Sequence, residues 1–164
     1  MARSIAKNLS TSQQSMRNIL SMIQEFATDV LLNTAGLAIG TSSKAKVKIV
    51  NTIYAMLNGV LVTKTTAEIT LAGTITADKF NVYVLSLKAD GTVTATMGTE
   101  GATIGAIVFP AVPADEAVVG FVIVNPTGTG NFVGGTTELD DATVVPNAVY
   151  INTPFPFNQD NLTW

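Results

Sequence analysis

The chain has 164 residues and a net charge of −3, with 47% hydrophobic residues, 13% charged residues, and neither cysteine nor histidine. Disorder along the whole chain is excluded, because disordered chains combine low hydrophobicity with high charge. The absence of cysteine and histidine excludes disulfides, thiolate and imidazole metal sites, cysteine nucleophiles and the commonest general base. We therefore predict a protein that is not an enzyme and binds no cofactor.

Charge is divided unevenly between the two halves of the chain. Residues 1–88 carry all nine basic residues and four acidic ones, a net charge of +5, whereas residues 89–164 carry eight acidic residues and no basic one. The basic half has no arginine cluster and few aromatic residues near its lysines, so we expect no nucleic-acid partner. Either the two halves interleave in one domain, or copies or a partner meet positive face to negative face.

No segment has the composition of a membrane span or of a signal peptide. The longest strongly apolar run covers residues 118–124, whereas a spanning helix needs about 18 apolar residues. Arg3 and Lys7 are followed by residues that are mostly serine, threonine and glutamine, without an apolar region beside them. The sequence therefore predicts no membrane partner and no export by a signal peptide.

The first predicted element is one amphipathic α-helix over about residues 11–32, within an N-terminal segment that we assign to residues 1–36. Apolar residues recur there at steps of three and four, and Ser10 with Gln13 has the spacing of a capping box. The apolar stripe either packs on the chain's own sheet, or binds copies of the chain or another protein. Its candidate interface residues are Met16, Ile19, Leu20, Ile23, Phe26 and Val30.

After Gly36 the hydrophobic period changes to two, which indicates β-strands in a domain that we assign to residues 37–151. Residues 44–49 alternate lysine with apolar residues, and lysines along one face are typical of an edge strand. Apolar runs on both sides of Asn58-Gly59 predict a hairpin, because both turn positions need positive φ.

Further strands are predicted along the rest of this domain, with turns every few residues. Nothing alternates with helices, so we expect an antiparallel β-sandwich or barrel-like domain rather than a parallel sheet. The strands are expected at residues 68–71, 79–87, 92–97, 104–109, 117–124 and 142–151.

The C-terminal tail, residues 152–164, has an unusual composition. Two prolines favour an extended chain, and Phe155, Phe157 and Trp164 fall within 13 residues. Large aromatic side chains favour burial, so we predict that this tail lies in a groove. The groove belongs either to the chain's own domain, or to a neighbouring copy or a shell beneath it.

Carboxylates are the remaining candidates for chemistry. Asp115-Glu116 and the cluster Glu138, Asp140 and Asp141 read as solvated turns, because residues adjacent in a turn rarely flank one bond as glycoside hydrolysis requires. The cluster has oxygen ligands for a calcium ion but lacks the spacing of an EF-hand loop. We therefore predict no catalytic and no metal-binding residues.

Three apolar segments carry a resemblance to a known family. They are residues 53–59 followed by Lys64, residues 80–85 leading into residues 90–94, and residues 107–113 followed by residues 119–124. From about Asn51 to Tyr150 the chain resembles small virion proteins of tailed bacteriophages, of the capsid decoration (cement) and head-fibre type. This resemblance implies a non-enzymatic β-domain that assembles as a homo-oligomer, often a trimer, on the outside of a head. It transfers no functional residues.

The expected function is therefore that of a capsid decoration protein, made in the host cytoplasm and located on the virion surface. Its expected partners are further copies of itself, most simply in a homotrimer, and the major capsid protein. Exposed apolar surface usually marks interfaces, and closed symmetry is the default for self-association. A phage tail fibre, adaptor or receptor-binding component is one alternative. The alternative from another class is a carbohydrate-active spike module that uses Asp115, Glu116, Glu138 or Asp140.

Overall fold

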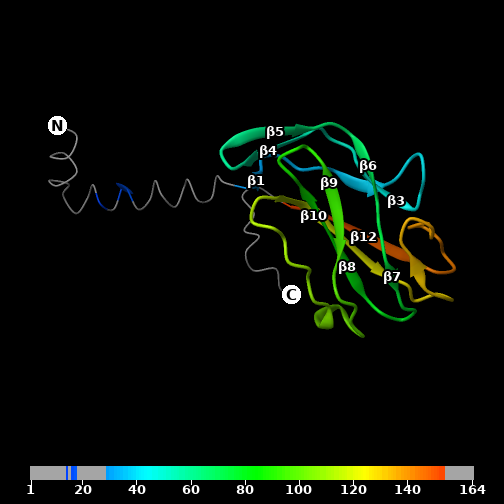
Figure 1. The fold of residues 1–164 in the computed structure, drawn as a ribbon. Coiled ribbons are helices and arrows are strands. Elements are labelled where there is room, and N and C mark those ends of the chain that lie inside the picture. Colours follow the sequence, from blue (N-terminus) through cyan, green and yellow to red (C-terminus); the bar gives the residue numbers. More distant parts are fainter. Residues whose placement is uncertain (1–13, 15, 18–28, 154–164) are drawn as a thin grey trace, which may run out of the picture.

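The computed structural model describes residues 14, 16, 17 and 29–153, and this part of the chain is mainly β (Figure 1). Every pair of hydrogen-bonded strands in it is antiparallel, as predicted. The elements are β1 (Val30–Leu31), β2 (Leu37–Ile39), β3 (Lys46–Ile49), β4 (Ile53–Leu57), β5 (Val60–Lys64), β6 (Ala67–Thr70), β7 (Thr74–Ile75), β8 (Asn81–Leu87), β9 (Val93–Met97), the 3-10 helix η1 (Ile104–Ala106), β10 (Ala117–Asn125), β11 (Phe132–Val133) and β12 (Asn147–Asn152).

These strands form four sheets. The largest has the order β12-β10-β8-β9, two three-stranded sheets have the orders β1-β4-β5 and β2-β3-β6, and β11 pairs with β7. In Figure 1, β3, β4, β5 and β6 form an upper layer above β8, β10 and β12. No sheet of the described residues closes on itself, so the barrel alternative is wrong.

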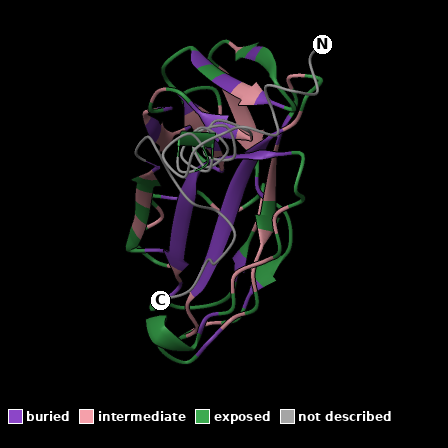
Figure 2. Cartoon of the chain, turned by 90° about the vertical axis from the view of Figure 1, so that its left-hand side faces the viewer, coloured by how far each residue is buried: buried purple, intermediate pink, exposed green. Residues whose placement is uncertain are grey.

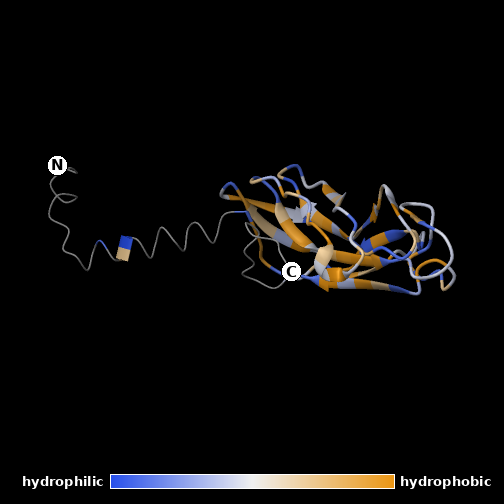
Figure 3. Ribbon diagram, turned by 90° about the horizontal axis from the view of Figure 1, so that it is seen from below, coloured by the Kyte–Doolittle hydropathy of each residue, from blue (hydrophilic) through white to orange (hydrophobic). Residues whose placement is uncertain are grey.

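The main core lies between these layers. One cluster of buried apolar side chains draws on all four sheets, including Ile49 on β3, Ile53 on β4 and Leu85 on β8. Tyr83 and Phe132, 49 positions apart in the chain, meet edge to face with ring centroids 6.3 Å apart. Figure 3 shows the strands mainly orange and many of the connecting loops white or blue, as this burial requires.

Strands β8 and β10 are buried on both faces (Figure 2). All of β8 is buried, and so is all of β10 except Asn125. On the face away from the main core, Val84 and Phe121 pack against Ile107, which lies between η1 and β10. Phe109 meets Phe121 edge to face at 5.6 Å. Continuous apolar runs such as these two strands are typical of sheets that are covered on both sides.

A bulge in β10 requires the glycine at position 120. The register of β10 against β8 shifts between Val118 and Gly120. A Cβ atom on Gly120 would lie 2.5 Å from the carbonyl oxygen of Ile151 and 2.6 Å from Cδ1 of Leu37. Glycine therefore lets β12 and β2 approach β10 closely at this point.

The hairpin predicted at Asn58-Gly59 is confirmed. Strands β4 and β5 pair on either side of it, and the two turn residues have φ values of +48° and +76°. The predicted hairpin of β8 and β9 and the predicted strand β10 are also present. Local turn chemistry and hydrophobic period therefore located these elements correctly.

Strand β3 keeps the predicted alternation but is not an edge strand. Val47 and Ile49 are fully buried, whereas Lys46 and Lys48 are half-buried. However, β3 lies between β2 and β6, and Lys48 is directly opposite Glu68 of β6. The edge interpretation is wrong because β3 is hydrogen-bonded to a strand on each side, a long-range pairing that the lysine pattern does not reveal.

The helix predicted over residues 11–32 is not found as an element of the described structure. Residues 14, 16 and 17 are helical, but residues 11–13, 15 and 18–28 lie outside the part of the chain that is described. The tail, residues 154–164, lies outside it as well.

The predicted end of that helix is wrong. Asp29 has a φ of +57°, and Val30–Leu31 forms β1, which pairs with β4. The Asp29 carboxylate accepts a hydrogen bond from the N–H of Asn58, with 3.0 Å between Oδ1 and N. Pairing with β4 satisfies the backbone of two buried residues, a long-range gain that helical spacing in the sequence could not indicate.

Two more predicted strands need correction. Residues 104–109 hold η1 and a single bridge from Val108 to Thr99, because this segment covers the outer side of β8 and β10 instead of joining a sheet. The last strand, β12, begins at Asn147 and not at residue 142. It directly follows Pro146, which has no N–H for a strand ladder.

Candidate functional site

The sheet β1-β4-β5 has an apolar face turned away from the main core. Leu32 continues the ladder of β1, since its N–H donates to the carbonyl oxygen of Tyr54 at 2.8 Å. Exposed fractions on this face reach 40% for Leu32, 44% for Tyr54 and 57% for Leu61. We call it the outer apolar face, and the strand register assigns to it Val30, Leu32, Tyr54, Met56, Leu61 and Thr63, none of which is charged.

One signal in the sequence could have revealed this face. Strand β4 is apolar at all five positions, so it supplies apolar side chains to both sides of its sheet, whereas a half-exposed strand alternates. Sequence analysis assigned this run only to a hairpin. Leu61 joins the face through the predicted hairpin with β4, whereas Leu32 joins it through the pairing of β1 with β4, which the sequence did not indicate.

The structure describes two of the predicted interface residues. Met16 is exposed, and Val30 is buried on the outer apolar face, in a strand rather than a helix. Their role in an interface stays a prediction. The other predicted interface residues lie outside the described part of the chain: Ile19, Leu20, Ile23, Phe26, Phe155, Phe157 and Trp164.

The described domain begins and ends at the same side. Strand β1 contacts β10, and β12 ends where Asn152 pairs with Gly120, near the start of β10. Thr153 is buried, and its hydroxyl lies 3.1 Å and 3.2 Å from the carbonyl oxygens of Val118 and Val119. Figure 1 shows β1 and the end of β12 together at the left of the domain. The predicted helical segment and the aromatic tail are therefore joined to the domain at one end.

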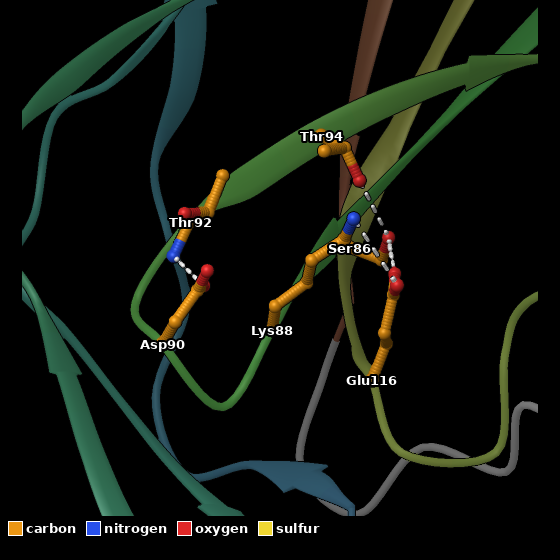
Figure 4. A network of polar contacts seen from close by, with 6 residues as sticks. All are labelled: Ser86, Lys88, Asp90, Thr92, Thr94 and Glu116. Carbon is orange, nitrogen blue, oxygen red and sulfur yellow. Dashed lines mark hydrogen bonds and ion pairs between the residues drawn. The ribbon is translucent and has the colours of Figure 1, made fainter.

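A buried carboxylate lies beside the sheet of β8 and β10 (Figure 4). Glu116 is only 7% exposed and accepts a hydrogen bond from the hydroxyl of Ser86. Its second oxygen is 3.8 Å from Nζ of Lys88, and the Ser86 hydroxyl is 3.4 Å from that of Thr94. A buried charge is costly without such partners. This network therefore ties the start of β10 to β8 and β9.

The other candidate carboxylates stand in separate groups. Asp115 is exposed while its neighbour Glu116 is buried, so the two do not face a common site. Asp140 forms an ion pair with Lys44 at 2.7 Å. The Asp141 carboxylate accepts a hydrogen bond at 2.8 Å from the N–H of Thr143. Among the described residues, no three acidic side chains are placed to hold a metal ion.

The halves of opposite charge interleave in the fold. The ion pairs Lys44–Asp140 and Lys88–Glu116 each join a lysine of residues 1–88 to a carboxylate of residues 89–164. Of the two interpretations of the uneven charge, this arrangement favours interleaving within one domain.

Glu68 organises a turn between β2 and β3. Its carboxylate accepts hydrogen bonds from the N–H groups of Thr41 at 2.6 Å and Ser42 at 2.8 Å, and from the Ser42 hydroxyl. The hydrogen bonds from Ser42, the hydroxyl first, lower the pKa of Glu68 to about 2. The ionised carboxylate therefore fastens this turn to β6 at neutral and mildly acidic pH.

Comparison with known proteins identified no relative, because no family model, curated protein or solved structure matches the chain. Within the described residues, the structure has no helix that is long and apolar enough to cross a membrane.

Proposed function

We propose that this chain is a non-enzymatic virion protein that decorates and stabilises a bacteriophage head as a capsid decoration, or cement, protein. The observation that carries the proposal is that β1 and the end of β12 lie at the same side of the domain, so the residues before β1 and after β12 are attached to it there (Figure 1). Two attachment segments at one end leave the rest of the domain free to project from a shell. The resemblance over residues 51–150 supports the same class.

In this proposal the β-domain is a sandwich, preceded by a helix and followed by an extended tail. Copies form a homotrimer on the outer surface of the head, with the major capsid protein as the second partner. Neither a cofactor nor nucleic acid nor a membrane takes part, and the protein is made in the host cytoplasm. The tail anchors through Phe155, Phe157 and Trp164, because interface energy concentrates in large aromatic side chains. Its prolines reduce the conformational freedom lost on binding.

Copy number in purified particles tests the location. A head decoration protein should be present in hundreds of copies per particle, in a fixed ratio to the major capsid protein, because it follows the repeated symmetry of the shell. A tail fibre, adaptor or receptor-binding component would be present in only about a dozen copies, which would contradict the decoration role.

The aromatic anchors are tested by the double variant Phe155→Ala/Phe157→Ala in the full chain. We expect binding to undecorated heads to weaken by at least about 2 kcal/mol, with the melting temperature unchanged. Val133→Ala, an exposed apolar residue on β11, is the matched control and should bind normally. If the double variant instead melts at a lower temperature and binds heads once folded, the tail packs on its own domain and the anchor role is wrong.

A further inference from the structure

The end of β12 is fastened to the domain by the side chains of Asn152 and Thr153. The side-chain oxygen of Asn152 accepts a hydrogen bond from the N–H of Leu37 on β2, with 2.9 Å between Oδ1 and N. The Thr153 hydroxyl lies within hydrogen-bond distance of the carbonyl oxygens of Val118 and Val119 on β10. Because β2 and β10 belong to different sheets, these contacts join the end of β12 to two sheets at once.

The bulge in β10 explains why a hydroxyl is needed at position 153. Val119 is fully buried, and the strand register gives it a partner in neither β8 nor β12. A buried carbonyl oxygen outside a strand ladder needs another donor, because leaving it unpaired costs free energy. The Thr153 hydroxyl, itself in a residue that is only 2% exposed, supplies this donor at 3.2 Å.

The same bulge makes the contact of Asn152 possible. Strand β2 is at the edge of its sheet, and Leu37 directs its N–H to Asn152. The backbone of β12 and the side chain of Leu37 both approach Gly120, where any Cβ atom would collide with them. The glycine in the bulge therefore lets β12 come close enough to β2 for this hydrogen bond.

We propose that Asn152 and Thr153 are positioning residues, which fix the point at which the C-terminal tail leaves the domain. This inference rests on the proposed function, in which the tail anchors the protein on a head, and it names the residues that hold the base of that anchor. A fixed base removes backbone freedom before binding, so less conformational entropy is lost when the tail binds. Side chains that only stabilised the fold would not change the affinity of the folded protein for heads.

The variant Thr153→Val in the full chain tests the first contact, because it keeps the shape of the side chain and removes the hydroxyl. In the free protein, the N–H groups at the end of β12 should exchange with solvent at least about 5-fold faster, since this end opens more often. The dissociation constant for undecorated heads, measured below the melting temperature, should rise about tenfold. Thr153→Ser keeps the hydroxyl and should restore both values. Thr96→Val, at an exposed position of β9, is the matched control and should change neither.

The variant Asn152→Ala tests the second contact. The N–H of Leu37 loses its acceptor and should exchange at least about 5-fold faster, and the affinity for heads should fall as well. Asn152→Asp keeps an acceptor oxygen at this position and should leave the N–H of Leu37 protected.

Three results would overturn the proposal. Unchanged exchange in both Thr153→Val and Asn152→Ala would show that neither side chain holds the end of β12. Faster exchange with an unchanged affinity for heads would show that a fixed base does not assist the tail. Equal defects in Thr153→Val and Thr153→Ser would show that the hydroxyl is not responsible.

Two further outcomes are also decisive. Should Thr153→Val fail to fold, Asn152→Ala decides by the same two measurements. If the wild type binds no heads while exchange responds as expected in the variants, the proposed function is rejected and the fixed exit of the chain at Thr153 stands.

Discussion

Two sheets of this protein contain strands of similar apolar composition, but these strands differ in how far their outer side is buried. Strand β8 in the β12-β10-β8-β9 sheet and strand β4 in the β1-β4-β5 sheet are both rich in apolar residues at inward and outward positions. The outer side of β8 is covered by residues of the segment between β9 and β10, such as Ile107, whereas Tyr54 on the outer side of β4 is 44% exposed. A strand that is apolar on both sides therefore indicates only that both faces of its sheet carry apolar side chains to be buried. The face on which these side chains stay exposed is the better candidate for an interaction surface.

The strongest test of this comparison is Leu85→Ala on β8. Leu85 is fully buried in the main core, so truncation should lower the free energy of unfolding by about 2–5 kcal/mol, measured by denaturant titration. Leu61→Ala on β5 is the matched variant. At dilutions where copies are separate it should change this free energy by less than about 0.5 kcal/mol. Equal losses at the two positions would mean that Leu61 belongs to the fold of the single chain.

A smaller effect is expected from Ser86→Ala, which tests how the outer side of β8 is held. The variant removes a hydroxyl donor from the buried carboxylate of Glu116, so the free energy of unfolding should fall by about 1–3 kcal/mol. Thr94→Ala removes only the 3.4 Å contact to Ser86 and should cost less. If both variants are as stable as the wild type, the network does not hold the start of β10.

The smallest effect concerns Glu68, which fastens a surface turn to the β2-β3-β6 sheet. Because its pKa in the folded protein is about 2 and the ordinary value is 4.5, its stabilisation is fully present above pH 4.5 and is lost as the pH falls towards 2. The melting temperature of Glu68→Gln should therefore decline less than that of the wild type between pH 4.5 and 2. The difference is modest because exposed charges are screened by solvent.

Ser42→Ala should reproduce much of the Glu68→Gln result, because the Ser42 hydroxyl is the first cause of the lowered pKa. If the melting temperatures of the wild type and Glu68→Gln fall equally between pH 4.5 and 2, the carboxylate does not stabilise the turn.

Sequence analysis located most of the β-structure because the signals involved are local. Asn58-Gly59 specified a turn through its need for positive φ, and residues 117–124 specified a strand through a continuous β-branched and apolar run. The prediction was wrong at Val30, because the helical spacing of apolar residues continues into Val30 and Leu31, which pair with β4 as a strand. It also missed the burial of Glu116, because the partner Ser86 is 30 positions away in the chain.

By itself, the sequence determined that this chain builds antiparallel sheets, where its tight hairpins turn, and which catalytic groups it cannot use. Those properties follow from composition and from backbone preferences within a few residues. Only the tertiary structure decided that β3 lies inside its sheet, that β1 and the end of β12 lie at the same side of the domain, and that Leu32 joins Tyr54 and Leu61 on one apolar face. The physical reason is that strand order and face coverage depend on pairing between segments far apart in the chain, which local preferences do not encode.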